Sequence, residues 1–490
     1  MPTAAAEDQL TEKCAVFGVC GTGLEAARLA FYGLWALQHR GQESSGIASS
    51  DGTALHRHAA PGLVANVYRE EDFEQLPGHL AIGHNRYSTS GGTDSTNTQP
   101  FIDYDKQFAF AHNGNLPDCS KLIKFLSSHD IEPAALSDSA MMSAAIGYYI
   151  GKGMNIADAV KKCYPLFTGV FSAVAMDKTT LVAFRDKRGI RPMSLASLDG
   201  GYVVASETCA FDTIGAKFIR DVRPGEMVVV TKEGMRSVQV EKGREQVDIF
   251  EFVYFARPDS RILGESVNTV RKNFGRQMAT EFNLDADVVV PVPDSAIPAA
   301  LGYAEASGIP FEMGLMKNRY IHRTFIRPTA ELRERDLKMK LNPVIETIKD
   351  KRVILVDDSI VRGTTLRKVV TMLFEAGAKE VHVAISSPPV KYPDFYGINT
   401  PDSDELIAAH MTVKGICNYV GATSLNYLSY DGMINATGFP ASRFSTSCFN
   451  GIYPISIGAR AKEFDVPKKA NPLKRAKAKI LLTAHHHAAA

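Results

Sequence analysis

The first half of the chain alternates short apolar runs with glycine-rich turns. These runs predict strands that include 108–112, 170–175, 181–184 and 202–205. Helical segments, for example Ser139 to Ile150, separate the strands. The order has little of the regular strand–helix–strand repeat of a parallel sheet, so we expect sheets packed with helices.

The second half has a strand–helix–strand rhythm. The runs Val288–Val290, Val353–Val356 and Val381–Ile385 are apolar at every position, which is typical of strands in a parallel sheet covered on both faces. The segment Lys317–Asn342 is rich in Arg and Lys and poor in apolar residues, and we interpret it as a mobile basic loop. The polar stretch Glu241–Gln246 is the predicted boundary between the halves.

Two carboxylates, Asp357 and Asp358, directly follow the strand at 353–356. The loop 359–365 then offers backbone N–H groups, three hydroxyls and Arg362 at the start of a helix with apolar positions Leu366, Val369, Val370, Leu373 and Phe374. Open α/β sheets bind ligands at the carboxyl ends of strands, and helix N-termini hold phosphates. Adjacent carboxylates suit ribose hydroxyls or Mg²⁺. The segment predicts a sugar-phosphate site; the alternative is a solvated acidic turn.

Length and charge narrow the class of protein. A chain of 490 residues exceeds one ordinary domain. The 55 basic and 54 acidic residues nearly cancel, which gives no electrostatic case for nucleic-acid binding. No apolar run reaches the length of a transmembrane helix, so we expect no membrane span. The first 13 residues lack the apolar core of a secretory signal.

The cysteines indicate the redox compartment. Seven of them are scattered along the chain and none forms a CxxC pair, which favours reduced thiols and a cytoplasmic location. Beyond Phe464 the chain becomes basic, and we interpret 466–490 as a solvated tail rather than a binding arm.

Several polar segments of the first half carry a family resemblance. They are Leu37–Ile47, Gly83–Gly91, Ala111–Asn115 and Ser137–Ser139. Together with Cys14 at the start of the first apolar strand, they closely resemble the class II glutamine amidotransferases. The resemblance implies an α+β N-terminal-nucleophile hydrolase domain, with stacked sheets between helices, over 14–245. Taken alone, a cysteine at the start of a strand is more often a core residue.

In that family the cysteine is residue one of the mature chain and its α-amine is the base. The resemblance therefore implies that 1–13 is a propeptide, removed autocatalytically between Lys13 and Cys14. The chemistry is sound, because thiolates attack amide carbons well and an α-amine has a pKa near about 7.7–8.0.

The remaining residues of this site are also assigned by resemblance. Asn113 and Gly114 are expected to form the oxyanion hole, Arg86 to bind the glutamine α-carboxylate and Asp138 to receive its α-ammonium. Taken singly, Arg86 and Asp138 would be better explained as a surface ion pair.

The loop after Val356 resembles the phosphoribosylpyrophosphate (PRPP) loop of type I phosphoribosyltransferases. From Cys14 to about Tyr453 the whole chain resembles the glutamine phosphoribosylpyrophosphate amidotransferase family, which implies an α/β type I phosphoribosyltransferase domain with a parallel sheet over 246–465. Two further family-like blocks, Val203–Asp212 and Phe255–Ser260, lie outside the two sites.

The resemblance implies a set of PRPP-binding residues and one Mg²⁺ per subunit, held by Ser295, Asp357 and Asp358. The PRPP-binding residues are Asp294, Ser295, Asp357, Asp358, Ser359, Arg362, Gly363, Thr364 and Thr365, with Arg319, Lys338 and Lys340 of the basic loop able to close over pyrophosphate. Each loop cation is equally well explained as a solvated residue.

Some members of the family hold an iron–sulfur cluster with four cysteines. Here the matching positions are Asp248, Asp394, Ser442 and Ser445, and only Cys448 lies nearby. One thiolate cannot hold such a cluster, so the chain resembles the cluster-free branch, with Cys448 as a buried structural thiol.

The implied activity is the first committed step of de novo purine synthesis. Glutamine is hydrolysed, and ammonia passes inside the protein to PRPP, giving 5-phosphoribosylamine, glutamate and pyrophosphate. The resemblance also implies purine nucleotides as feedback inhibitors and a homotetramer. The alternatives are another class II amidotransferase, such as glucosamine-6-phosphate synthase or asparagine synthetase, and a non-enzymatic PRPP-sensing regulator. The first alternative does not explain the PRPP loop, and the second leaves Cys14, Arg86, Asn113 and Asp138 without a purpose.

Overall fold

The fold was determined as a computed structural model that describes residues 14–87, 97–318, 340–396 and 403–461. By its contacts the chain divides into a large unit, Met1–Ser456, and a second unit from Ile457, described only to the short helix η7 (Gly458–Ala461). The first predicted domain and residues 246–456 of the second both lie in the large unit, so the boundary at 246 stays a prediction.

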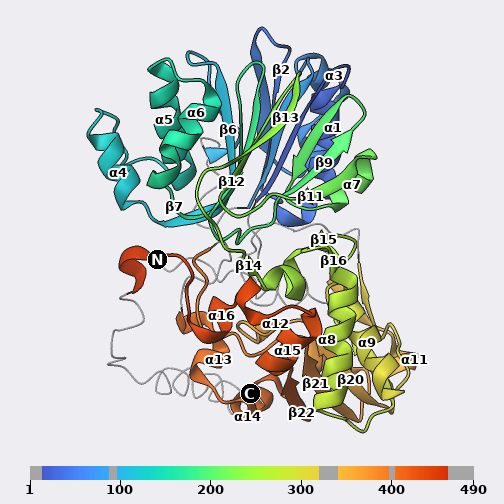
Figure 1. Cartoon of the computed structure of the whole chain (residues 1–490). Coiled ribbons are helices and arrows are strands. Elements are labelled where there is room, and N and C mark those ends of the chain that lie inside the picture. The colour runs from blue at the N-terminus through green and yellow to red at the C-terminus, as the bar shows by residue number, and fades with distance from the viewer. Residues whose placement is uncertain (1–13, 88–96, 319–339, 397–402, 462–490) are drawn as a thin grey trace, which may run out of the picture. The chain divides into compact units, whose positions relative to one another are not determined.

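Two antiparallel sheets form the first half (Figure 1). One has the order β11-β9-β10-β1-β4-β2-β3, with strands β1 Ala15–Gly21, β2 Ser44–Ser50, β3 Leu55–Pro61, β4 Leu80–Arg86, β9 Ser194–Leu198, β10 Gly201–Ala205 and β11 Lys217–Asp221. The other has the order β13-β12-β8-β7-β6-β5, with strands β5 Phe101–Asp103, β6 Phe108–Asp118, β7 Thr168–Met176, β8 Leu181–Arg185, β12 Glu226–Thr231 and β13 Gly234–Gln239.

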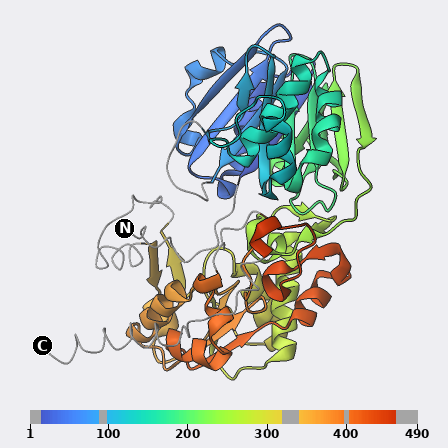
Figure 2. The same cartoon turned by 90° about the vertical axis from the view of Figure 1, so that its left-hand side faces the viewer.

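Helices cover the outer face of each sheet (Figures 1 and 2). Those on the first sheet are α1 Ala26–Ala36, α2 Val64–Val67, α3 Glu70–Glu74 and α7 Cys209–Ile214; those on the second are α4 Ser120–Ser127, α5 Asp138–Gly151 and α6 Ile156–Cys163. The side chains of strand β1 alternate between the two faces of its sheet, so each face packs against a different layer. Phe17 and Val19 pack with α1, whereas Val16 and Cys20 pack with residues of the second sheet. The expected stacked sheets between helices are confirmed.

A parallel sheet of order β17-β20-β21-β22 forms the centre of the second half, as predicted. Its strands are β17 Val288–Pro291, β20 Arg352–Asp357, β21 Glu380–Ile385 and β22 Ser424–Tyr427. In β20, Ile354 and Val356 join the core with α8 and α9, whereas Val353 and Leu355 join the core with α12 and α14. The helices of this half are α8 Val267–Glu281, α9 Ile297–Ser307, α11 Ile345–Ile348, α12 Thr364–Glu375, α13 Ile407–His410, α14 Val413–Val420, α15 Tyr430–Thr437 and α16 Ser447–Asn450.

Short elements connect these layers. They are the parallel pair β14 Val247–Asp248 and β23 Phe444–Ser445, the hairpin β15 Arg261–Ile262 and β16 Glu265–Ser266, the pair β18 Leu315–Lys317 and β19 Leu341–Pro343, and the π-helix η4 Glu251–Phe255. The pair β18–β19 corrects the prediction of a loop over the whole of 317–342. Lys317 pairs with Leu341, because backbone hydrogen bonding joins the two ends of the basic segment.

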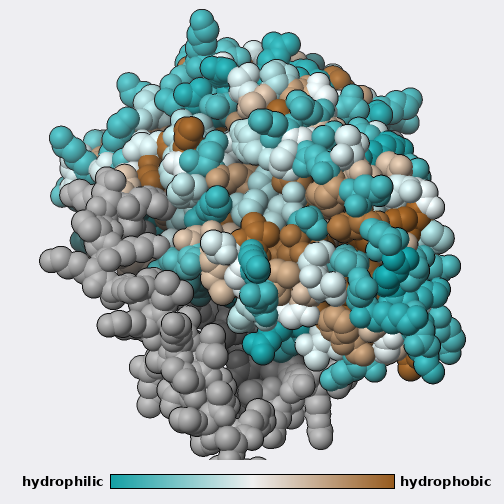
Figure 3. Space-filling view, turned by 90° about the horizontal axis from the view of Figure 1, so that it is seen from below, coloured by the Kyte–Doolittle hydropathy of each residue, from teal (hydrophilic) through white to brown (hydrophobic). Residues whose placement is uncertain are grey.

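The surface of the second half mixes polar and apolar side chains on the face in Figure 3. Phe374, expected on the buried side of its helix, is 38% exposed, because α12 turns Leu366, Val370 and Leu373 toward the sheet instead. Within the described ranges, no helix combines the length and apolar character needed to cross a membrane.

Candidate active sites

The pairing of β1 with β4 brings two predicted residues of the first site together. Cys14 immediately precedes β1, and Arg86 is the last residue of β4. Ala15 pairs with Asn85 in this antiparallel ladder, so Cys14 and Arg86 lie side by side at the same end of it.

Asn113 reaches this end of β1 from the other sheet. It lies on β6, is 1% exposed, and its Nδ2 atom is 3.5 Å from the hydroxyl oxygen of Ser206. The same oxygen accepts a hydrogen bond from the N–H of Val16 at 3.0 Å. Ser206 therefore links Asn113 to the strand that Cys14 begins.

Only glycine fits at residue 114. Its φ angle is 150°, and a β-carbon there would lie 2.0 Å from the carbonyl oxygen of Val170. The backbone of Gly114 can therefore approach β7 closely without displacing it.

Asp138 is fixed against the same strand. It is the first residue of α5, after the N-cap Ser137, and its Oδ2 atom accepts a hydrogen bond from the N–H of Leu116 at 3.0 Å. Its Oδ1 atom accepts from the N–H of Ser139 at 2.7 Å. The carboxylate thus lies at the part of β6 that directly follows Gly114.

Two buried histidines, His84 and His112, lie on the strands that carry Arg86 and Asn113. The sequence alone assigned no role to them. His112 contacts the hydroxyl of Ser139 through Nδ1 at 2.9 Å and the carbonyl oxygen of Val170 through Nε2 at 3.2 Å. His84 contacts the carbonyl oxygen of His112 at 3.2 Å. Burial lowers the pKa of both, that of His84 to about 3. Neutral imidazoles therefore connect β4, β6 and α5.

The second site forms where β17 and β20 end. The hydroxyls of Ser295 and Ser359 donate to the two carboxylate oxygens of Asp358, at 2.5 and 2.6 Å, and the N–H of Asp358 donates to Asp357 at 2.9 Å. Asp358 is only 7% exposed. Burial raises its pKa, although these hydroxyls and the charge of Arg271 act in the opposite direction.

A pocket opens over these carboxylates. Its lining residues are Tyr254, Val292, Pro293, Ser295, Asp357, Asp358, Ser359, Ile360, Val361, Gly363, Thr365 and Leu366. Six of the predicted PRPP-binding residues are therefore brought together, and Thr364 begins α12 beside them.

The other predicted PRPP-binding residues lie around this pocket or outside the described part. Asp294 accepts a hydrogen bond from Lys317 Nζ at 2.9 Å, and the guanidinium of Arg362 pairs with Glu405. Lys340 precedes β19, and its carbonyl accepts from the N–H of Asn318 at 2.9 Å. Arg319 and Lys338 lie outside the described residues.

Gly363 shapes the loop above the carboxylates. It is the N-cap of α12 and has a φ angle of 76°, which favours glycine. A β-carbon there would lie 3.2 Å from the Ile407 side chain, close enough to displace one of the two.

The donor set suits Mg²⁺. Ser295, Asp357 and Asp358 offer hard oxygen atoms, and Mg²⁺ is usually bound by one or two carboxylates together with substrate phosphates and water. Within the described residues, no group of three or more His, Cys, Asp or Glu could hold a metal without such further ligands. A metal bound jointly with PRPP therefore fits this site.

The positions that match the cluster ligands do not suit iron and sulfide. Asp248, Asp394 and Ser445 are buried oxygen donors, and Cys448 is a buried thiol, whose pKa is raised by burial and by the two carboxylates. Ser442 is exposed and lies outside this buried group. A single soft ligand does not fit a cluster.

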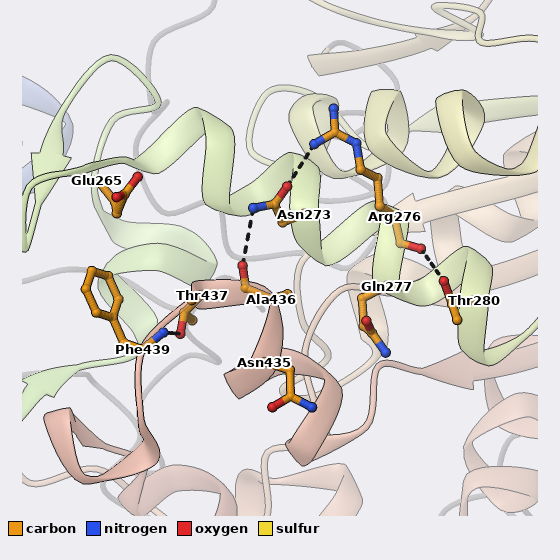
Figure 4. A pocket seen from close by; sticks show the side chains of 10 residues that line it. Glu265, Asn273, Arg276, Gln277, Thr280, Asn435, Ala436, Thr437 and Phe439 are labelled. Carbon is orange, nitrogen blue, oxygen red and sulfur yellow. Dashed lines mark hydrogen bonds between the residues drawn. The ribbon is translucent and has the colours of Figure 1, made fainter.

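A separate polar pocket lies between α8 and α15 (Figure 4). In it Arg276 donates to the side chain of Asn273, which donates to the carbonyl of Ala436 at 3.4 Å. None of the residues predicted for either site lines it, so we assign it no part in the reaction.

Three residues near the two sites were not predicted from the sequence. Ser206 lies in the family-like block 203–212, and Tyr254 directly precedes the block 255–260. Arg271, on the polar-looking helix α8, is 3% exposed and acts electrostatically on Asp358. The sequence marked the blocks, but contacts between distant segments could not be read from it.

Comparison with known proteins agrees with this geometry. Family models described as "Glutamine amidotransferase domain" and "Phosphoribosyl transferase domain" match residues 84–213 and 263–388. The chain is 45% identical over 457 residues to an amidophosphoribosyltransferase of Synechocystis, covering 92% of both chains, and 43% identical over 459 residues to that of Bacillus subtilis, covering 91% of this chain and 95% of the relative.

A solved structure extends the likeness to three dimensions. The glutamine PRPP amidotransferase of B. subtilis, in complex with ADP and GMP, superposes with a TM-score of 0.85 and 42% identity, covering 91% of this chain and 98% of that chain. The pairing of a glutamine site with a PRPP-type site in one chain is thus shared by these relatives. This chain belongs to the amidophosphoribosyltransferase family.

Proposed function

We propose that the chain transfers the amide nitrogen of glutamine to PRPP, the first committed step of de novo purine synthesis. The products are 5-phosphoribosylamine, glutamate and pyrophosphate. The observation that carries this proposal is the presence in one compact unit of both residue groups, around Cys14 and around Asp357 and Asp358.

Glutamine is hydrolysed in the first half. The thiol of Cys14 loses its proton to the α-amine of the mature chain and attacks the amide carbon. Asn113 and the backbone of Gly114 stabilise the oxyanion; one such donor typically lowers the barrier by about 2.7–4 kcal/mol. Ammonia leaves with the returned proton, and water then cleaves the thioester to glutamate. The links from Ser206 to Asn113 and to β1 support this arrangement.

Arg86 and Asp138 bind the two charged groups of the glutamine backbone. Arg86 stands beside Cys14 at the end of the ladder and suits a carboxylate. Asp138 suits an ammonium group, and its two hydrogen bonds to backbone N–H groups hold the carboxylate in place.

PRPP binds in the second half. The carboxylates at 357 and 358 receive the ribose hydroxyls, while the backbone of the loop 359–365 and the start of α12 hold the 5-phosphate. Ser295 and its loop receive the pyrophosphate. Ser295, Asp357 and Asp358 would hold a Mg²⁺ ion, which would supply positive charge to offset that of the phosphates. Ammonia attacks C1 of the ribose and pyrophosphate departs.

Ammonia passes between the sites inside the protein. In water it would be protonated and lose its nucleophilicity, so an enclosed path protects it. Purine nucleotides are the expected feedback inhibitors, and the B. subtilis relative was solved with ADP and GMP. A homotetramer in the cytoplasm and the absence of an iron–sulfur cluster remain predictions, which light scattering and iron analysis of purified protein test.

One assay separates this function from its alternatives. Pyrophosphate release from PRPP is measured with glutamine, with ammonia and with neither. Wild-type protein should respond to both nitrogen sources. Cys14→Ala should lose the response to glutamine and keep the response to high ammonia, because the second site needs only a nucleophile.

A control variant addresses folding. Cys20→Ala, at a buried position in the strand that Cys14 precedes, should keep both responses. No pyrophosphate release from wild-type protein would refute the function. Loss of both responses in a folded Cys14→Ala protein would refute the division into two sites.

A further inference from the structure

The two family-like blocks, 203–212 and 255–260, meet at the carboxylate of Glu207. Its Oε2 atom accepts hydrogen bonds from the N–H of Arg257 at 2.9 Å and from the hydroxyl of Ser260 at 2.6 Å. Both donors precede α8 in the second half of the chain. One buried side chain therefore joins the blocks to which neither site gave a role.

The other oxygen of Glu207 is held by the first half. Oε1 lies 2.7 Å from Nε2 of His39 and 3.1 Å from Nε of Arg40. Glu207 is 1% exposed, and burial alone would raise its pKa, but His39 and Arg40 outweigh burial and hold the pKa below its usual value. The ionised carboxylate of Glu207 is thus bound by residues from both halves of the chain.

The neighbours of Glu207 extend the link in both directions. Ser206 accepts from the N–H of Val16, two residues after Cys14, and lies beside the Asn113 amide. Thr208 accepts through its hydroxyl oxygen from the N–H of Arg261 at 2.9 Å. Three consecutive side chains therefore connect the glutamine site to the segment 257–261.

That segment continues into the wall of the PRPP pocket. The preceding π-helix, Glu251–Phe255, carries Tyr254, which lines the pocket over Asp358. Arg271 holds the same stretch by donating to two of its carbonyls, at 2.6 Å to Phe252 and 2.9 Å to Ala256. Glu251 also pairs with Arg40, which is fully buried.

We propose that Glu207 is a positioning residue that couples the two sites. A change in the PRPP pocket moves the segment 251–261, and Glu207 passes this movement to Ser206 and so to Asn113. The inference rests on the proposed function, because it assigns Asn113 to the oxyanion hole. Contiguous hydrogen-bonded and packed groups of this kind are able to carry coupling between distant sites.

Glu207→Gln tests the coupling. The variant keeps the size of the side chain and removes the negative charge that His39, Arg257 and Ser260 contact by hydrogen bonds and Arg40 by an ion pair. The rate of glutamine hydrolysis is measured with and without PRPP. If the two sites are coupled as proposed, PRPP stimulates glutamine hydrolysis in wild-type protein. This stimulation should be about tenfold smaller in the variant, within the range of typical coupling between sites. The ammonia-dependent reaction should stay within about twofold of wild type, since it needs no signal from PRPP to Asn113.

Glu226→Gln is the matched control. Glu226 is also 1% exposed and is held by Arg220, Arg223 and Ser237, which all belong to the first half. Its loss removes a similar buried charge without touching the second half, so stimulation by PRPP should be retained. Equal loss in both variants would mean that the effect is general destabilisation and would overturn the proposal.

Ser260→Ala keeps the test decisive if Glu207→Gln does not fold. It removes one hydroxyl and leaves Arg257 bound to the carboxylate. Coupling is reciprocal, so a ligand of the glutamine site should strengthen PRPP binding less in this variant than in wild type. Unchanged coupling in folded Ser260→Ala would overturn the inference but not the function. The same holds if wild-type protein makes phosphoribosylamine but its glutamine hydrolysis is not stimulated by PRPP. Wild-type protein that makes no phosphoribosylamine would refute the function itself.

Discussion

Individual side chains give the PRPP site its charge. Asp358 is buried and both of its oxygens are occupied by hydroxyl donors, whereas Asp357 is less buried. The position of both carboxylates directly after an apolar run predicted that they belong to a ligand site. The sequence did not predict that Ser295 bonds directly to Asp358, because 63 positions separate them.

Replacement of either carboxylate with Asn should weaken PRPP binding. A hydrogen bond to a charged group contributes roughly 1.5–3 kcal/mol, so affinity should fall about ten- to a hundredfold. Titration calorimetry of Asp357→Asn and Asp358→Asn measures this. Glutamine hydrolysis without PRPP should survive in both. Normal PRPP affinity in both folded variants would show that the loop is structural.

His84 should make the first half sensitive to acid. Its pKa in the folded protein is about 3, below the ordinary value of about 6.5. Unfolded protein therefore binds more protons as the pH falls, and the contribution of His84 is complete above pH 6.5 and is lost between about 6.5 and 3. From pH 7 to 5, this should lower the free energy of unfolding by about 2 kcal/mol.

Denaturation of wild type and His84→Gln at both pH values checks this. The glutamine side chain keeps a donor for the carbonyl of His112 but cannot take up a proton. The variant should lose less stability on acidification than wild type. The same loss in both proteins would assign the acid sensitivity to other groups.

Strand β6 is longer than its apolar run indicated, and the added part contains two predicted site residues. The run 108–112 predicted a short strand, but β6 continues to Asp118. Asn113 pairs with Ser172 and Gly114 with Phe171 of β7. Pairing with a neighbouring strand, not local hydrophobicity, places Asn113 and Gly114, the proposed oxyanion residues, on β6.

Gly363→Ala tests the geometry of the loop before α12. A left-handed conformation costs an alanine roughly 1–2 kcal/mol, and the new β-carbon also crowds Ile407. The loop should shift and PRPP affinity should fall about tenfold, measured by calorimetry.

Gly308→Ala provides the comparison. Gly308 has a φ angle of 73° at the end of α9, with no atom within 4 Å of a β-carbon. Its strain should lower stability similarly without affecting PRPP. If both variants lose affinity alike, the effect comes from strain in the fold and not from the loop.

In the whole molecule, the proposed mechanism requires the mature chain to begin at Cys14. Cys14 has a φ angle of 69°, which non-glycine residues rarely adopt. A cysteine that begins a processed chain has no φ angle, so this restriction would not apply to it. Intact-mass analysis of active enzyme should find Cys14 at the N-terminus. Active protein that retains the first 13 residues would contradict the role of the α-amine.

Patterns formed by residues close together in the chain predicted much of the fold. Short apolar runs between glycine-rich turns predicted sheets packed with helices in the first half, and uniformly apolar runs predicted the parallel sheet of the second half. The order strand, two carboxylates, hydroxyl-rich loop and helix predicted a sugar-phosphate site, which stays a prediction. These features depend on neighbours in the chain, since strand burial and helix starts are set by spacing within a few residues.

Contacts between distant segments depended on folding. The bonds of Ser295 to Asp358, Ser206 to Val16 and Glu207 to Ser260 each join segments more than fifty positions apart. The meeting of the two blocks at Glu207 follows from how sheets and helices pack, because the buried charge needs donors that only packing supplies. Spacing along the chain carries no information about which distant donors those will be.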